Sequence, residues 1–324
     1  MQVALIIPTH NAAGNWNSLH ECIRKQRFIP QWVLIIDSSS RDGTEELARN
    51  AGFQVIRIDQ RDFNHGRTRQ LAAKYVPDAE ILIYLTQDAI PSDTDAFWNI
   101  LAAFENPWIG AAYGRQLPRF GAGPIEAHAR YLNYPPISRI CDSESRKTIG
   151  FKAAFSSNSF AAYRRTALDQ VGGFPSDTIF AEDSIVFARL QMAGWKTAYV
   201  ADATVIHSHE YTIREEFSRY FDIGVFHTRE GWIEKEFRTP YGEGLRFVIS
   251  EIKYLFPRHI HLIPLAALHT LAKSIGYHLG RREANLPIAV KHALSMHKNF
   301  WNPVTVTKNH MPSNLGPHEP PPPY

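Results

Sequence analysis

The chain has few cysteines, little net charge and no long apolar run, and each shortage excludes a class of protein. Cys22 and Cys141 are the two cysteines in 324 residues, which excludes a disulfide framework or a cysteine zinc site and favours a reducing compartment. The formal net charge of +3 is too small to indicate a nucleic-acid partner. No uninterrupted run of about 18 apolar residues occurs, so we expect no membrane-spanning helix. The N-terminus begins directly with an apolar strand at Val3 rather than with a signal peptide, so a cytoplasmic or peripheral protein is expected.

What the chain does contain is a regular alternation of apolar runs and helical patterns in its first third. Four runs rich in Ile, Leu and Val are typical of buried parallel strands. They are Val3–Ile7, Trp32–Ile36, Val55–Ile58 and Ile81–Leu85. Helical patterns lie between them at about 16–26, 46–50 and 66–75, the second preceded by a possible capping box of Asp42 and Glu45 and followed by Gly52 as a stop. This order predicts a doubly wound, Rossmann-like α/β sheet, in which ligands bind beyond the carboxyl ends of the strands.

The rest of the chain is organised differently. From about 115 to 150 the periodicity fades and four prolines occur, which predicts an irregular segment over the mouth of the site. Order returns with an apolar run at 155–163, a helical pattern at 184–193 and a strand at 197–200. Helices are expected from about 214 to 300. The proline-rich segment 302–324 is expected to be disordered.

Polar side chains follow three of the four predicted strands. Pro8–Asn11 follows the first strand, Asp37–Thr44 the second and Thr86–Ala89 the fourth. Turn chemistry alone explains any one of these segments, but the three together converge on one edge of the sheet. Asp37 is suited to accept hydrogen bonds from a nucleoside base or ribose, and Asp88 to hold a divalent cation against a pyrophosphate. The sequence therefore predicts a nucleoside diphosphate site at this edge.

These three segments resemble the nucleotide-binding half of family 2 glycosyltransferases, which have the type-A glycosyltransferase fold with a mostly parallel sheet. Further motifs resemble the acceptor side of that family in the same order. They are Ser157–Ser159, Gly172–Phe174, Ala181–Asp183 and Arg189. The resemblance covers roughly residues 1–210. It implies a catalytic domain at 1–213, with a nucleotide-binding half up to about 114 and an acceptor half at 115–213, followed by a helical region at 214–301.

A narrower resemblance concerns the sugar. Phe63–Arg69 and Leu85–Pro91 resemble the bacterial rhamnosyltransferase subgroup. That subgroup implies dTDP-L-rhamnose as the donor and a glycan or lipid-linked saccharide as the acceptor, in O-antigen, lipopolysaccharide core or other surface polysaccharide synthesis. From the residues themselves, His65, Arg67 and Arg69 open a predicted helix, where backbone N–H groups and cations favour phosphate. Solvated surface charges are the alternative for the two arginines.

The family resemblance also implies individual roles. Inverting transfer requires a general base and a stabiliser of the leaving group. The resemblance assigns the base to Asp183, with Glu182 orienting the base or the acceptor, although acids at a helix start are also explained by the helix dipole. It assigns Mg²⁺ or Mn²⁺ to Asp88 and His207. Gln87 stands in place of a second acidic metal residue.

The complete prediction for the binding residues follows from these motifs. The predicted donor-binding residues are Pro8, Thr9, His10, Asn11, Asp37, Ser39, His65, Gly66, Arg67, Arg69, Gln87 and Asp88. The predicted acceptor-side residues are Ser157, Asn158 and Arg189. Ser38 stands where many relatives have a second aspartate, which leaves the choice of nucleoside base open.

The C-terminal third interleaves apolar and basic residues from Leu245 to Gly280. This mixture favours contact with the inner face of the cell membrane, which suits a lipid-linked acceptor. Helices packed on the catalytic domain, or a homodimer face, are the alternatives. For the function as a whole, a UDP-hexose donor and a non-catalytic module that binds nucleotide sugars also stay open. A Rossmann oxidoreductase is disfavoured, because Pro8–Asn11 replaces the glycine-rich turn after the first strand.

Overall fold

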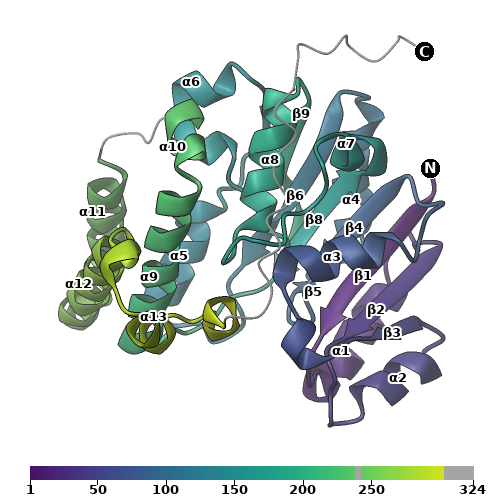
Figure 1. The fold of residues 1–324 in the computed structure, drawn as a ribbon, viewed down its shortest axis with the longest axis horizontal. Coiled ribbons are helices and arrows are strands. Elements are labelled where there is room, and N and C mark those ends of the chain that lie inside the picture. Colours follow the sequence, from purple (N-terminus) through teal and green to yellow (C-terminus); the bar gives the residue numbers. More distant parts are fainter. Residues whose placement is uncertain (238–241, 303–324) are drawn as a thin grey trace.

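The computed structural model describes residues 1–237 and 242–302. The strands are β1 Val3–Thr9, β2 Trp32–Asp37, β3 Gln54–Arg57, β4 Ile81–Leu85, β5 Ile90–Pro91, β6 Ile109–Leu117, β7 Arg139–Cys141, β8 Phe160–Arg164 and β9 Lys196–Ile206. The helices are α1 Ala13–Arg24, α2 Thr44–Asn50, α3 His65–Ala73, α4 Ala96–Ala102, α5 Pro124–Asn133, α6 Ser145–Ile149, α7 Arg165–Gln170, α8 Glu182–Met192, α9 Ile213–Arg229, α10 Gly231–Phe237, α11 Glu243–Leu255, α12 Ile263–Gly280 and α13 Ile288–Leu294. Figure 1 shows one continuous sheet with helices on both sides and a separate group of C-terminal helices at one end.

The sheet has a parallel half and a mixed half. Its strand order is β3-β2-β1-β4-β8-β6-β9-β5, and β7 pairs with β9. The four strands of the predicted Rossmann-like half, β3, β2, β1 and β4, are parallel. β8 runs antiparallel to both of its neighbours, β4 and β6, whereas β6 and β9 are parallel. The first four predicted strands are confirmed to within two residues at either end.

Both faces of the central strands β1 and β4 are covered, which explains why these strands are almost entirely apolar. In β1, Val3, Leu5 and Ile7 pack with α1 and α4, whereas Ala4 and Ile6 pack on the opposite face with α3 and α8. Successive residues of a strand point to opposite faces, so a strand buried on both sides has no polar position. In register, Thr9 at the end of β1 lies beside Asp37 at the end of β2. The polar residues that follow these strands therefore meet at one edge.

Two local predictions were wrong. Asp42 and Glu45 do not form a capping box. Instead, Gly43 caps α2 in the left-handed conformation (φ 89°), the Asp42 carboxylate accepts from the Thr44 N–H, and Glu45 pairs with Arg49. The segment 115–150 is not irregular, because it contains the end of β6, α5, β7 and α6. Pro124 begins α5, where its missing N–H and fixed φ are favourable, rather than interrupting order.

The C-terminal helices pack on one another through glycines. A Cβ at Gly276 of α12 would lie 2.3 Å from the Phe217 carbonyl oxygen of α9, and one at Gly280 would lie 2.0 Å from that of Phe221. Glycine is therefore required for this close approach of two helix backbones. The α9 helix itself begins with a capping box of Thr212 and Glu215. Of the predicted disordered tail, 303–324 lies outside the described residues. Among the helices of the described chain, none has the length and hydropathy that crossing a bilayer requires.

Candidate active site

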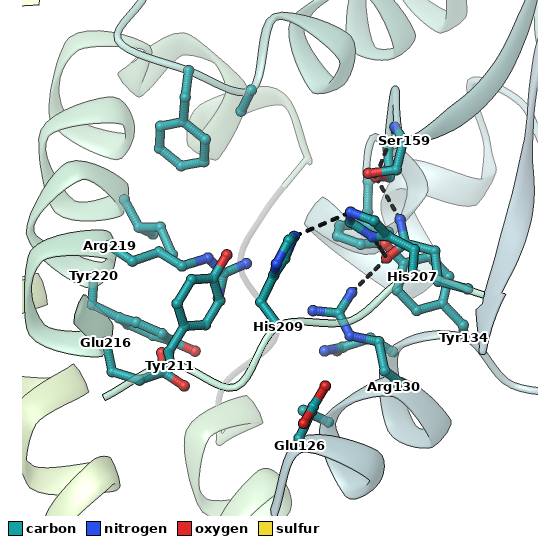
Figure 2. Close-up of a pocket in the computed structure, with 18 of the residues that line it drawn as sticks. Glu126, Arg130, Tyr134, Ser159, His207, His209, Tyr211, Glu216, Arg219 and Tyr220 are labelled. Atoms are coloured by element: carbon teal, nitrogen blue, oxygen red, sulfur yellow. Dashed lines mark hydrogen bonds between the residues drawn. The ribbon is translucent and has the colours of Figure 1, made fainter. Parts of the chain in front are cut away.

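A cavity of about 660 Å³ lies between the carboxyl edge of the sheet and the C-terminal helices. The catalytic half contributes the loops after β4 and β9 and the loop before β8, together with the starts of α3, α5 and α8. The opposite wall comes from α9, α11 and α12. Figure 2 shows both walls, with Arg219 and Tyr220 of α9 facing His207 and Arg130 across the cavity and His209 between them.

Asp88, His207 and His209 form a cluster suited to a divalent metal. The Asp88 carboxylate oxygens lie 3.4 Å from Nε2 of His207 and 3.3 Å from Nε2 of His209. One ligand atom from each of the three residues lies within 4.8 Å of the others. A carboxylate and two imidazoles on one side of an open cavity leave further coordination positions for oxygen atoms of a substrate. The donor set therefore fits the metal that the sequence implied.

The protonation of this cluster also suits metal binding. Burial raises the pKa of the Asp88 carboxyl, but the hydrogen bond and positive charge of His207 outweigh burial and hold that pKa well below its usual range. Burial and the neighbouring His207 lower the pKa of His209. A metal site needs ionised carboxylates and neutral imidazoles, and these shifts favour an ionised Asp88 and a neutral His209.

Gln116 at the end of β6 orients the His207 ring. Its side-chain oxygen accepts from Nδ1 of His207 at 3.0 Å and also from the Arg130 guanidinium. The Gln116 amide donates in turn to the Ser157 hydroxyl at 2.7 Å. With Nδ1 protonated, the Nε2 lone pair of His207 is directed toward Asp88 and any bound metal.

Neither Gln116 nor His209 was predicted as a site residue. His209 had a usable signal, because residues two positions apart in an extended segment point to the same side, and His209 follows His207 at that spacing just beyond β9. Ser208, between them, points the other way and contacts Glu126. Gln116 offered no such signal in the sequence.

Glu182 and Asp183 begin α8 and reach the same cavity. Glu182 is buried, accepts from the Arg69 guanidinium at 2.8 Å and accepts from the Asn158 amide at 2.9 Å. Asp183 accepts from the backbone N–H of Asn158 at 2.8 Å and from that of Ser184 at 2.7 Å. Asn158 therefore contacts both carboxylates, one through its side chain and one through its backbone.

The environment separates the pKa values of these two neighbouring carboxyls. Burial raises the pKa of Asp183 to about 7, and the negative charge of Glu182 adds to that shift. Burial also acts on Glu182, but the positive charge of Arg69 outweighs it and lowers the pKa of that carboxyl. One carboxylate is thus held charged while the other is poised to take or release a proton near neutral pH, a pattern typical of catalytic pairs.

Several predicted donor-binding residues have other partners. Arg69 lines the cavity, where it is buried and paired with Glu182. Arg67 donates to the Asp62 carbonyl and does not line the cavity. Gly66 packs against Pro175, whose carbonyl oxygen would lie 1.7 Å from an added Cβ. His65 does line the cavity, and burial is the main reason that its pKa falls to about 4.

The residues after β1 and β2 lie at the same edge but outside the cavity lining. Asp37 is fully buried and accepts from Thr9 and Ser40. Its oxygens therefore hold the loop after β2. Gln87 is not part of the metal cluster. Its side chain accepts from the His10 N–H and donates to the His10 carbonyl, which ties the loop after β1 to the loop that carries Asp88.

Some of the remaining predicted residues line the cavity, and others lie outside it. Ser39, at φ 59°, donates to the Ile58 carbonyl, and Asn11, at φ 50°, accepts from the Arg41 N–H. Pro8 lies within β1 beside these loops. Ser157 and Asn158 line the cavity. Arg189 does not line the cavity; it lies farther along α8 and interacts electrostatically with Glu230 and Asp177.

The comparisons with known proteins decide the family. Residues 4–172 match the model of the family described as Glycosyl transferase family 2. A protein named O-antigen chain rhamnosyltransferase RfbN, from Salmonella typhimurium, is 46% identical over 303 residues, which are 93% of this chain and 96% of that protein. The chain belongs to glycosyl transferase family 2. O-antigen chain rhamnosyltransferase WbaN from Salmonella anatum is 44% identical over 299 residues, 92% of this chain and 95% of that protein.

Solved structures agree on the fold of this glycosyltransferase. Mannosyltransferase PcManGT from Pyrobaculum calidifontis, solved with GDP-Man and Mn²⁺, superposes with a TM-score of 0.61 at 16% identity, covering 85% of this chain and 86% of that one. Residues 1–349 of TarS from S. aureus superpose with a TM-score of 0.52 at 15% identity, covering 88% and 91%. The predicted type-A glycosyltransferase fold and the family resemblance are confirmed.

The metal cluster generates a direct prediction. With a nucleoside diphosphate present, the wild-type protein should bind Mn²⁺ in titration calorimetry, and His209→Ala should lose most of that affinity because it removes a ligand. Gln116→Leu should weaken binding by roughly 10–100-fold, as loss of a partner of a metal-bound histidine does. Binding should weaken as the pH falls toward 5, because protonated imidazole is not a ligand. His261→Ala, an exposed histidine outside the cavity, is the control, and equal affinity in His209→Ala would remove the cluster from metal binding.

Proposed function

We propose that this family 2 glycosyltransferase transfers L-rhamnose from dTDP-L-rhamnose, with inversion, to a hydroxyl of a lipid-linked glycan during O-antigen synthesis. Two relatives that are 46% and 44% identical over nearly their whole lengths are named O-antigen chain rhamnosyltransferases, and this observation carries the proposal. The cavity supports a catalytic rather than a purely binding protein, because a candidate metal cluster and a carboxylate pair with separated pKa values line it together.

The proposed chemical step is a single displacement at the anomeric carbon. Asp183 takes the proton of the acceptor hydroxyl as its oxygen bonds to the anomeric carbon and the bond to the diphosphate oxygen breaks. Glu182 stays ionised through Arg69, and its charge keeps the Asp183 carboxylate basic. Asn158 holds both carboxylates in place through its amide and its backbone N–H. A base with a pKa near the working pH combines a large ionised fraction with good proton affinity.

The departing dTDP carries developing negative charge, and the cavity holds positive groups to meet it. Asp88, His207 and His209 would hold Mg²⁺ or Mn²⁺, which neutralises that charge when bound. Two nitrogen ligands favour Mn²⁺ over Mg²⁺, since Mg²⁺ prefers oxygen ligands. The Arg130 and Arg219 guanidinium groups also line the cavity and raise its positive potential beside His209.

The donor can be tested directly. Purified protein is offered dTDP-L-rhamnose, UDP-glucose and UDP-N-acetylglucosamine, and release of nucleoside diphosphate is measured with and without EDTA. We expect turnover with dTDP-L-rhamnose that EDTA suppresses. Faster turnover with either UDP sugar would replace the rhamnosyl assignment with a hexosyl one. The absence of turnover with any donor, in a folded sample supplied with a lipid-linked glycan fraction, would favour a binding module.

The role of Asp183 generates a prediction for rate and pH. Asp183→Asn should lower kcat by about 10²–10⁴-fold while leaving the donor Kd nearly unchanged, because a general base acts in the chemical step. In the wild type, kcat should rise with pH up to about 7 and then level off, since the base works when it is deprotonated. Glu182→Gln removes the negative neighbour that raises the Asp183 pKa, so this rising limb should move to lower pH.

The control for that experiment is Asp202→Asn, an exposed carboxylate outside the cavity. Its rate and pH profile should match the wild type. An Asp183→Asn variant that keeps most of its turnover would show that another group takes the proton.

We further propose that the enzyme works at an anionic membrane surface, in keeping with a lipid-linked acceptor. Figure 1 shows α11 and α12 at the end of the molecule opposite β3. Both helices carry a stripe of exposed apolar side chains at helical spacing. The stripes are Leu245, Ile249, Ile252 and Phe256 on α11 and just beyond it, and Leu265, Leu268, Leu271 and Ile275 on α12.

The charges around these stripes favour an anionic surface. Between residues 244 and 280 the sequence contains one acidic residue, Glu251, and its side chain is buried. Arg246, Lys253 and Arg258 are exposed in the same region. Each basic residue close to an anionic bilayer adds about 1 kcal/mol of attraction, and exposed apolar side chains enter the headgroup boundary.

Vesicle co-sedimentation tests this location. The full-length protein should pellet with phosphatidylglycerol vesicles more than with phosphatidylcholine vesicles, and the double variant Leu268→Glu with Leu271→Glu should stay in the supernatant. Ile137→Glu, at an exposed apolar position (74%) outside α11 and α12, should behave as wild type. If the double variant instead converts a dimer to a monomer without changing vesicle binding, the apolar face is a homodimer interface.

A further inference from the structure

A second polar cluster lies in the cavity wall formed by the C-terminal helices. Glu216 of α9 and His269 and Lys273 of α12 line the cavity, and each is only 9% exposed. The Lys273 ammonium lies 3.3 Å from one carboxylate oxygen of Glu216. The other carboxylate oxygen of Glu216 and Nδ1 of His269 are buried without a hydrogen-bond partner. Buried polar atoms without partners are costly, so their presence beside a cavity indicates a ligand that supplies them.

Aromatic rings adjoin these polar groups. The Lys273 ammonium lies 4.9 Å from the centroid of the Phe247 ring and 5.7 Å from that of Tyr220, and both rings line the cavity. Aromatic surface with a few fixed polar groups is the usual composition of a site for a small organic ligand. In a sugar, hydroxyls bond to the carboxylate, ammonium and imidazole, while the C–H face packs on a ring.

The charge balance of the cluster favours a neutral ligand. Glu216 and Lys273 compensate each other as an ion pair, and Arg219 and Glu251, which both interact electrostatically with Glu216, add one basic and one acidic group. Burial lowers the pKa of His269, so its imidazole is neutral at pH 7 and offers one donor and one acceptor. A phosphate would face the Glu216 carboxylate at close range, whereas a sugar hydroxyl can donate to that carboxylate and accept from Lys273.

The position of the cluster separates it from the reacting groups. Figure 2 shows Glu216 and Tyr220 on the wall opposite His207 and Tyr134, with His209 between the two walls. The donor diphosphate belongs with the metal cluster and the attacking hydroxyl with Asp183. A ligand on the α9 and α12 wall is therefore a part of the acceptor that does not react.

We propose that Glu216, His269 and Lys273 form a subsite for a neutral sugar unit of the acceptor glycan, beside the unit that receives the new bond. This inference rests on the proposed glycosyl transfer and adds the acceptor contacts. The C-terminal helices thereby select the acceptor with the face of α12 that lines the cavity, while Leu268, Leu271 and Ile275 of the same helix are exposed outside the cavity.

Saturation-transfer NMR tests the subsite without requiring turnover. The probes are the methyl glycosides of L-rhamnose, D-galactose and D-mannose, with dTDP present. At least one should bind the wild type, and Glu216→Gln and Lys273→Met should each weaken that binding by roughly ten-fold or more, as loss of a charged hydrogen-bond partner does. Lys235→Met, an exposed lysine on α10, is the matched control, and Asp183→Asn should keep the sugar signal because it lies on the other wall.

Kinetics with a glycan acceptor gives a second readout. Lys273→Met should raise the acceptor KM about ten-fold and leave the donor KM and the slow hydrolysis of the donor unchanged, which also shows that the variant is folded. The subsite would be overturned if Glu216→Gln and Lys273→Met each reduced donor hydrolysis as much as transfer to the acceptor. It would also be overturned if the wild-type protein bound none of the glycosides. Displacement of the glycoside by inorganic phosphate would overturn it in favour of an anion site. The outcome of the assay with the three nucleotide sugars, which tests the proposed function, does not depend on these results.

Discussion

Arg69 and Glu182 come from positions 113 residues apart and form a buried ion pair that joins the two halves of the catalytic region. Arg69 belongs to α3 in the nucleotide-binding half, and Glu182 begins α8 in the acceptor half. Breaking such a pair by removing one partner leaves an uncompensated buried charge, which costs about 3–5 kcal/mol. The pair also fixes the charge that raises the Asp183 pKa, so the geometry of the fold and the acidity of the proposed base depend on the same contact.

Three regions of the chain line the cavity, and each contributes a different group of side chains. The sheet edge after β4 and β9 supplies Asp88 and the two histidines, and the start of α8 supplies the carboxylate pair. The C-terminal helices close the opposite wall with a mixture of aromatic and charged side chains. In the proposed mechanism, this division places metal and diphosphate chemistry at the ends of the sheet strands and acceptor recognition on helices outside the sheet.

The α12 helix explains why these functions can be joined in one molecule. Its glycines allow close packing on α9, which brings Lys273 and His269 to the cavity wall. Leu268 and Leu271, outside the cavity lining, stay exposed. An acceptor whose lipid lies in a bilayer and whose sugar lies in the cavity would contact the two faces of this one helix.

The sequence by itself determined the parallel strands, the edge where their polar residues meet and the family. These features follow from local patterns, because strand and helix periods are set by neighbouring residues and because motifs such as Asp88 with His207 lie in a fixed order. It also predicted Glu182 and Asp183 as site residues, and both line the cavity. The nature of α5 was missed because a proline at a helix start looks the same in sequence as a proline in a loop.

Tertiary structure alone decided which side chains meet. The ion pair of Arg69 with Glu182 and the hydrogen bonds of Asp37 within its own loop were not visible in the sequence. Gln116 and Lys273 line the cavity, although no pattern in the neighbouring sequence indicated this. The physical reason is that a buried polar group takes whichever partner the packing of distant elements brings within hydrogen-bond reach, and that partner is not encoded in the spacing of nearby residues.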